Sequence, residues 1–312
     1  MHRSRFIFAA AILIVSTALA ADRTEITFSG ERIFPESLSS TKDGTLYIGS
    51  LGQDSVYRAA PNSSKADTWI QPKSNGLHFV LGVLADEKRG TLWVCTSSSG
   101  GENGEPVVGE TVAKAFDLKA GALKASYPFP GGGLCNDIAV AKDGVVYFSD
   151  TRKTRVLRLK KGATALDVWA EDAALLDSAD GIALLADGAV YVNSVGKGFL
   201  VRIPVNPDGS AGKIVKLEAS QELKNPDGMR TVGKNTMLLV EGAGRLDEVT
   251  INGDKAEIKT LKDGLDHPTA VTLSHGMAYV TEAKLNYLFD ADMKGKDPGP
   301  FRVVGVPFKA GK

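Results

Sequence analysis

Several residue types that build common catalytic and metal sites are scarce in this sequence of 312 residues. It has two cysteines, Cys95 and Cys135, and four histidines. Neither cysteine lies in a Cys-x-x-Cys pair or close to a histidine, which argues against a zinc or catalytic thiol site. The sequence also has no Gly-x-Ser-x-Gly motif, phosphate-binding loop or His-Glu-x-x-His motif. It therefore does not indicate a serine hydrolase, a nucleotide enzyme or a zinc protease.

An excess of charge of one sign is also lacking. The chain has 37 Lys and Arg residues and 37 Asp and Glu residues, for a formal net charge of zero. Loss of residues 1–20, which contain Arg3 and Arg5 and no acidic residue, leaves 35 basic and 37 acidic residues. This balance gives no electrostatic reason to expect nucleic acid or an anionic membrane as a partner.

Long hydrophobic runs are absent except at the N-terminus. Arg3 and Arg5 precede an apolar run over residues 6–19, which ends in Ala18-Leu19-Ala20. This pattern predicts a signal peptide over residues 1–20 and an exported mature chain, periplasmic or secreted, over residues 21–312. The alternative is a membrane anchor, for which the run is short. In an oxidising compartment the two cysteines can form a disulfide or remain two buried thiols, and the sequence leaves both open.

One phrase recurs six times between residues 35 and 289: a turn, a strand-like run, a short gap and a second strand. Examples of the second strand are TLYIGS, TLWVCT, VVYFSD, AVYVNS and MAYVTE, mostly after Asp-Gly or a similar turn. Equivalent positions are residues 36, 82, 136, 180, 227 and 269, which lie 46, 54, 44, 47 and 42 residues apart. A repeat of this length with alternating strands predicts an all-β fold, a single six-bladed β-propeller of four-stranded blades over residues 21–312.

The pattern also predicts the third strands and the closure of the ring. Third strands are expected at residues 55–59, 112–117, 155–159, 199–204, 245–250 and 287–290. Residues 24–28 and 301–308 are also strand-like. We expect the N-terminal strand to complete the last blade, because this covers two open sheet edges at once.

The six equivalent positions place their side chains around one central channel. They are occupied by Glu36, Gly82, Asn136, Asp180, Asp227 and Thr269. Three carboxylates and one amide that converge in this way need a compensating cation. Oxygen donors without histidine or thiolate favour a hard ion, and calcium over zinc. The alternative is that these residues only form turns at the start of each blade.

The motifs resemble those of a known family. Cys135-Asn136-Asp137-Ile138, Ala179-Asp180-Gly181 and above all Asn225-Pro226-Asp227-Gly228-Met229 look like those of the senescence-marker-protein/gluconolactonase family. These proteins are six-bladed propellers with a central divalent cation. The resemblance implies that Glu36, Asn136, Asp180 and Asp227 bind the metal. It also implies that Asp227 is a general base and that Asn136 contacts substrate. Asp180 stands where the family usually has asparagine.

The resemblance implies a calcium-dependent hydrolase that acts on a small-molecule lactone or activated ester. In such an enzyme calcium polarises the carbonyl group and Asp227 positions or deprotonates the attacking water. Arg152 and Arg245, in loops on the same rim, are expected to bind the substrate. The main alternative is a non-enzymatic propeller that binds a sugar, peptide or protein, with calcium as a structural ion. A lyase or synthase without metal is a third possibility.

Overall fold

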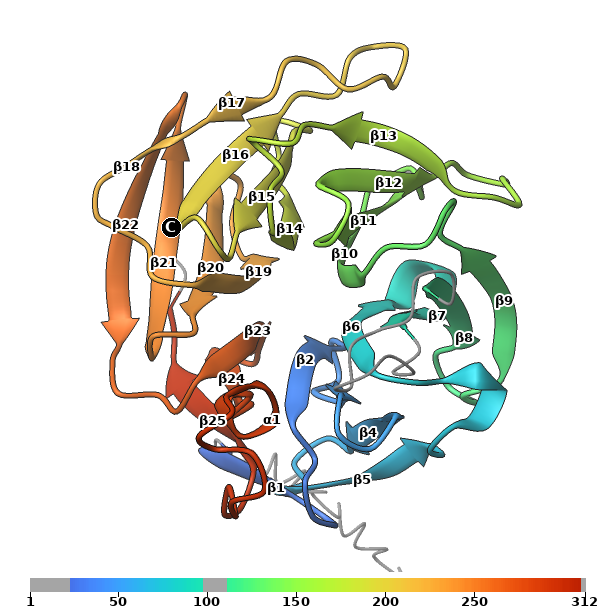
Figure 1. The fold of residues 1–312 in the computed structure, drawn as a ribbon, viewed down its shortest axis with the longest axis vertical. Coiled ribbons are helices and arrows are strands. Elements are labelled where there is room, and N and C mark those ends of the chain that lie inside the picture. The colour runs from blue at the N-terminus through green and yellow to red at the C-terminus, as the bar shows by residue number, and fades with distance from the viewer. Residues whose placement is uncertain (1–22, 98–110, 310–312) are drawn as a thin grey trace, which may run out of the picture.

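A computed structural model describes residues 23–97 and 111–309 of the chain. The predicted signal peptide, residues 1–20, lies outside these ranges. The described residues form β-sheets arranged around a central opening, as in a β-propeller (Figure 1). Among the described residues, no helix is long and apolar enough to cross a membrane.

Three of the sheets have four antiparallel strands each. One consists of β6 (Val80–Asp86), β7 (Thr91–Thr96), β8 (Val112–Asp117) and β9 (Leu123–Pro128). The next consists of β10 (Cys135–Val140), β11 (Val146–Asp150), β12 (Arg155–Leu159) and β13 (Asp167–Glu171). The third consists of β14 (Ala179–Leu184), β15 (Val190–Ser194), β16 (Phe199–Ile203) and β17 (Val215–Lys216).

The two remaining sheets are larger. The five-stranded sheet has the order β18 (Glu218–Ala219), β22 (Lys255–Lys262), β21 (Arg245–Asn252), β20 (Thr236–Glu241) and β19 (Pro226–Thr231). The eight-stranded sheet begins with β2 (Pro35–Ser40), β3 (Leu46–Ser50), β4 (Ser55–Ala59) and β5 (Lys65–Ile70). It continues with β1 (Glu25–Phe28), β25 (Arg302–Pro307), β24 (Met277–Glu282) and β23 (Pro268–Ser274).

Strand β1 joins the two ends of the chain. It pairs antiparallel with β25 and parallel with β5, so the N-terminal strand lies between the last sheet strands and the first. The sequence predicted the pairing of the N-terminal strand with the last strands, because both terminal segments are strand-like and this pairing covers two open sheet edges. On the inner side, β2, β6, β10, β14, β19 and β23 face the opening, and each contacts the next around the ring.

Three of the tight turns between first and second strands contain an Asp-Gly pair, at Asp43-Gly44, Asp143-Gly144 and Asp187-Gly188. Gly44 has a φ of 90°, a conformation that residues with a Cβ rarely adopt. The Asp43 Oδ1 atom accepts hydrogen bonds from the Thr41 hydroxyl at 2.7 Å and from the Thr45 N–H at 2.9 Å. Such turns fix the start of the second strand and thereby the register of each hairpin.

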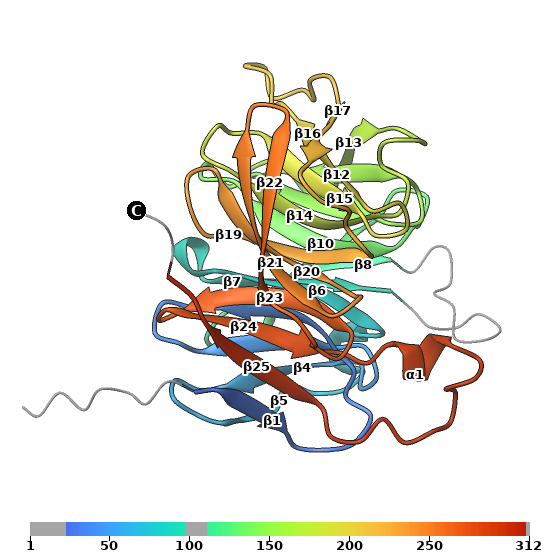
Figure 2. The ribbon, with the colours of Figure 1, turned by 90° about the vertical axis from the view of Figure 1, so that its left-hand side faces the viewer.

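One predicted strand is wrong. Residues 287–290 were expected to form the third strand of the last repeat, but β25 fills that place and α1 (Asn286–Phe289) covers most of the predicted range. Leu285, Tyr287 and Leu288 pack against the main hydrophobic core, so their apolar side chains serve packing rather than strand pairing. The α1 segment projects from one side of the ring (Figure 2).

The core lies between neighbouring sheets. For example, Tyr147 and Val156 of one sheet pack with Ile182 and Val190 of the next in a single buried cluster. Alternate residues of each strand therefore meet an adjacent sheet on either face, which explains why β7, β11 and β15 are buried along their whole length. The inner strands are consequently held in fixed positions around the opening.

Candidate functional site

The six inner strands start with the same local geometry. The first residue of each strand pairs with the last residue of the second strand, as Pro35 pairs with Ser50, and the register then shifts. Such β-bulges redirect side chains. The residue after each first residue therefore occupies an equivalent place beside the channel: Glu36, Leu81, Asn136, Asp180, Asp227 and Thr269.

This register corrects the expectation for Gly82. Strand β6 begins at Val80, which pairs with Thr96, so Leu81 and not Gly82 is equivalent to Asp180. Gly82 instead matches Gly181 and Gly228. A Cβ at any of the three would lie 2.1–2.6 Å from a backbone oxygen of the next inner strand. Glycine at these positions allows neighbouring inner strands to approach closely.

A small cavity lies where the four predicted oxygen donors meet. Its walls include Glu36, Asn136, Asp180 and Asp227, together with Asp137, Arg230 and Thr269. The volume is about 10 Å³, close to the smallest space that holds one water molecule. The structure therefore brings together all four predicted ligands, in a space that fits an ion or a water and not an organic substrate.

Hydrogen bonds fix two of these side chains. The Asn136 amide nitrogen donates to Asp180 Oδ2 at 2.9 Å and to the Thr151 hydroxyl at 3.0 Å. Thr151 in turn donates to the carbonyl oxygen of Ala179 at 2.7 Å. In contrast, Glu36 Oε2 and Asp180 Oδ1 are buried without a hydrogen-bond partner. Unpaired buried carboxylate oxygens are costly, and their presence here fits a cation as the missing partner.

The carboxylates strongly affect one another. Burial raises the pKa of Asp180 to about 7, with a further increase from the charge of Asp137 and a decrease from its hydrogen bonds to Asp227 and Asn136. Burial also raises the pKa of Asp227 well above its usual value, and the charges of Asp180 and Glu36 add to this. For Glu36 the causes of the raised pKa are burial and then the charges of Asp180 and Asp137. Burial and the mutual charges of the cluster therefore both disfavour full ionisation of these carboxylates in the absence of a cation.

The donor set suits a hard cation, because every candidate donor is a carboxylate or amide oxygen. Glu36, Asn136, Asp180 and Asp227 are the residues that would hold it. Among the described residues, however, no group of three or more His, Cys, Asp or Glu side chains has the arrangement of preformed metal ligands.

The two arginines expected to bind substrate do not line the carboxylate cavity. Arg152 is exposed in the turn after β11 and does not line the cavity. Arg245 forms an ion pair with the buried Glu241 at 2.6 Å and donates to the backbone oxygen of Glu222 at 3.1 Å. These contacts assign Arg245 to the support of β20 and of the loop before β19.

Two residues of the site were missed in the sequence. Asp137 follows Asn136 directly, and Arg230 stands three residues after Asp227; both line the cavity. They form a buried ion pair, with Arg230 Nη1 2.8 Å from Asp137 Oδ2. An arginine on an inner strand, where most other residues are small or apolar, is the signal that could have revealed them.

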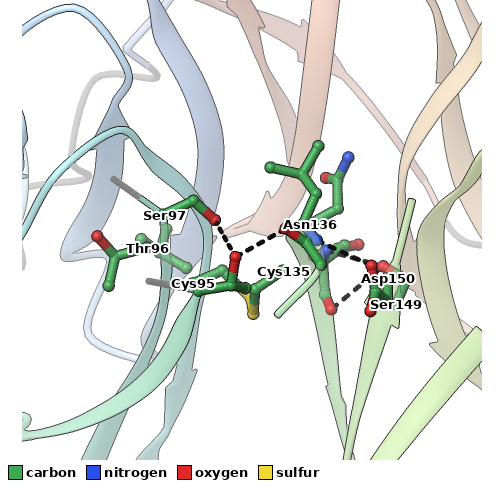
Figure 3. Close-up of a disulfide and its surroundings, with 12 residues drawn as sticks. Cys95, Thr96, Ser97, Cys135, Asn136, Ser149 and Asp150 are labelled. Carbon is green, nitrogen blue, oxygen red and sulfur yellow. Dashed lines mark hydrogen bonds between the residues drawn. A yellow bond between two sulfur atoms is a disulfide. The ribbon is translucent and has the colours of Figure 1, made fainter. Parts of the chain in front are cut away.

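A disulfide lies next to the site. Cys95 at the end of β7 bonds to Cys135, the first residue of β10 and the neighbour of Asn136 (Figure 3). The Cα atoms are 5.2 Å apart. Of the two possibilities that the sequence left open, the structure contains the disulfide. It connects the sheets that begin at β6 and β10 close to a predicted ligand.

Several solved structures have a similar fold. A gluconolactonase from Xanthomonas campestris matches with a TM-score of 0.62 and 16% identity, over 91% of this chain and 89% of that chain. The chain has the fold of gluconolactonase-type β-propellers. The major allergen Mala s 1 of Malassezia sympodialis has a TM-score of 0.68 and 12% identity, over 92% and 96% of the two chains. Virginiamycin B lyase of Staphylococcus aureus has a TM-score of 0.59 and 10% identity, over 91% of this chain and 98% of that chain.

No protein-family model matches the sequence, and no curated protein matches it significantly. The predicted resemblance to the gluconolactonase family is thus confirmed at the level of fold. At identities of 10–16%, the similarity defines the architecture, and function has to be argued from the site.

Proposed function

We propose that this chain is an exported, calcium-dependent hydrolase that acts on a lactone or activated ester at the mouth of its central channel. The observation that carries the proposal is the convergence of Glu36, Asn136, Asp180 and Asp227 on one small cavity, with two carboxylate oxygens left unpaired. The likeness to a gluconolactonase supports the reaction class.

The proposal includes a ring of six four-stranded blades closed by β1. Its support is the succession of six inner strands in mutual contact and the pairing of β1 with both β25 and β5. In this arrangement the eight-stranded sheet is two blades joined through β1. All four donors then lie on the same side of the ring, because each follows the first residue of its inner strand.

In the proposed mechanism Glu36, Asn136, Asp180 and Asp227 would hold a divalent cation, which would supply Lewis-acid polarisation of a carbonyl group when bound. Asp227, as the ionised carboxylate, would accept the proton of the attacking water. Asn136 is oriented by its hydrogen bonds to Asp180 and Thr151, which leave its side-chain oxygen for the cation or substrate. A carboxylate that also binds a cation is a weak base, which limits the substrate to lactones and activated esters.

A second candidate is a non-enzymatic binding propeller in which the cation is structural. The small volume of the cavity, about 10 Å³, favours this reading, because it accommodates an ion and no substrate group. In the enzyme the substrate must therefore lie above the cavity, with only its carbonyl group near the cation.

Export forms part of the proposal. It rests on the charged and apolar pattern of residues 1–20 and is supported by the disulfide between Cys95 and Cys135. Disulfides persist in oxidising compartments and are rare in the cytosol.

The test compares the mature chain with Asp227→Asn and with a surface control, Asp254→Asn. Turnover of a panel of lactones and aryl esters is measured with excess calcium and with chelator. We expect chelator to abolish turnover, Asp227→Asn to lower it by about 10²–10⁴-fold, and Asp254→Asn to leave it unchanged. If calcium-saturated wild-type protein hydrolyses nothing in the panel but its melting midpoint rises with calcium, the binding propeller replaces the enzyme.

A further inference from the structure

Arg230 lies across the channel directly beside the carboxylate cluster. Its Nη1 atom donates to Asp137 Oδ2 at 2.8 Å, to Asp137 Oδ1 at 3.1 Å and to the backbone oxygen of Met229 at 2.7 Å. Its Nη2 atom is 3.3 Å from the backbone oxygen of Val83 and 3.5 Å from that of Leu38. Both partners of the ion pair are buried, with side-chain exposures of 12% for Arg230 and 6% for Asp137.

These contacts connect five inner strands. Arg230 belongs to β19, Leu38 to β2, Val83 to β6 and Asp137 to β10. Asp137 Oδ2 also accepts the backbone N–H of Ile182 on β14, at 3.2 Å. The contact residues lie within three positions of Glu36, Leu81, Asn136, Asp180 and Asp227 on the same strands. The ion pair therefore fixes the strands that carry all four oxygen donors.

Arg230 also lies between two spaces of the molecule. It lines both the carboxylate cavity and a separate, mostly apolar pocket formed by residues such as Leu84, Ala139 and Ala183. Arg230 therefore stands at the boundary between a polar and an apolar space.

The charges give Arg230 a second role. The residues that line the cavity include the carboxylates of Glu36, Asp137, Asp180 and Asp227, and among these lining residues Arg230 alone is positively charged. Carboxylates held this close repel one another unless a cation offsets them. A guanidinium fixed by backbone oxygens provides a permanent positive charge at this place.

We propose that Arg230 is the resident cation of the channel, a positioning residue that keeps the inner strands and the donor cluster assembled before any metal binds. Its removal leaves Asp137 buried and unpaired and frees five strands from their common contact. A divalent cation then becomes the main remaining source of positive charge, so folding of the variant depends on it. The cation-dependent part of this inference rests on the proposed function.

The test measures melting midpoints in chelator and in excess calcium for wild type, Arg230→Met, Arg230→Lys and the double variant Asp137→Asn/Arg230→Met. Arg158→Met is the control, because Arg158 is also a buried arginine in an ion pair and lies on β12 away from the channel. Its partner Asp167, on β13, is partly exposed. In chelator we expect Arg230→Met to melt roughly 6–15 °C below wild type, as for the loss of one partner of a buried pair. The double variant should melt above Arg230→Met, because it contains no unpaired carboxylate.

Calcium should raise the midpoint of Arg230→Met by more than it raises those of wild type, Arg230→Lys or Arg158→Met. A calcium shift of the same non-zero size in Arg230→Met and Arg158→Met, or an Arg230→Met midpoint in chelator equal to that of wild type, overturns the proposal. If Arg230→Met does not fold in chelator, folding on addition of calcium supports the proposal, and failure to fold with calcium contradicts it. If no protein in the set responds to calcium, the proposed cation site is wrong. The positioning role is then decided by the order of midpoints in chelator alone.

Discussion

Asp247 should make the stability of this propeller fall between about pH 6 and pH 8. It lies on β21, completely buried, where it faces Glu241 on β20 and Thr260 on β22. Burial raises the pKa of Asp247 to about 7; the hydrogen bond with Glu241 adds to this, while Thr260 and the nearby Arg245 oppose it. Protonated Asp247 can donate to Glu241, and the ionised form brings two buried carboxylates together.

The sign and size of this pH effect follow from the difference between the pKa of Asp247 in the folded and unfolded states. The pKa of Asp247 is about 7 in the folded state against 3.8 for an ordinary aspartate. Folding therefore favours the protonated form, and this stabilisation is complete below 3.8 and is lost as the pH rises through about 7. Between about pH 6 and pH 8 the loss is about 1.4 kcal/mol, or roughly 3–6 °C in the melting midpoint.

Asp247→Asn should remove this loss, because the amide donates to Glu241 at every pH and does not ionise. Melting midpoints of wild type, Asp247→Asn and the exposed control Asp254→Asn are compared across the pH range in chelator. The raised pKa values of the channel carboxylates affect all three proteins alike, so the difference between the curves isolates Asp247. Parallel curves for wild type and Asp247→Asn would refute the reasoning.

Glu241 connects Asp247 to the candidate site. Glu241 accepts a hydrogen bond from the backbone N–H of Lys224, two residues before β19, and pairs with Arg245. Ionisation of Asp247 therefore acts on the loop that leads to Asp227. Asp247→Asn should also reduce the pH dependence of lactone turnover above neutral pH, provided that the proposed function is right.

Two further predictions concern the surroundings of Asn136. The disulfide closes a loop with a sequence separation of 40, so Cys95→Ala/Cys135→Ala should lower the unfolding free energy by about 4 kcal/mol. Denaturant unfolding of the reduced wild-type protein should show the same loss. Equal stability with and without reductant would contradict this prediction. Asp180→Asn should weaken calcium binding by roughly tenfold or more, since it removes a full charge from the site. Calorimetry measures this, and an unchanged affinity would remove Asp180 from the set of ligands.

Much of the fold was predictable because its signals are local. The bounds of β4, β8 and β12 agree with the predicted third strands, since the residues of each alternate in the expected way. Strands β4 and β12 also follow short turns. The segment at residues 287–290 failed because aromatic and aliphatic residues favour both strands and buried helical turns. Only the pairing of β24 with β25, across a gap of 19 residues between Glu282 and Arg302, decided between the two.

The site residues that occupy the equivalent position of each repeat were predictable from the sequence. Glu36, Asn136, Asp180 and Asp227 meet as their equivalent positions indicate. Gly82 was assigned wrongly because glycine was matched by position in the motif instead of by its close approach to the next strand. Asp137 and Arg230 lie 93 residues apart, and no local pattern connects them. Residue contacts across the channel become visible only in three dimensions.

The ion pair also changes how the extra charge at Asp180 should be interpreted. Of the four carboxylates around the cavity, Asp137 is already satisfied by Arg230 and by the backbone of β14. The other three, Glu36, Asp180 and Asp227, remain for the proposed cation, and two of their oxygens have no partner. Three negative charges around a divalent ion favour tight binding but weaken its ability to polarise a carbonyl group. The charge that favours cation binding therefore restricts the proposed catalysis to substrates with a good leaving group. For this reason activated esters belong in the panel beside lactones.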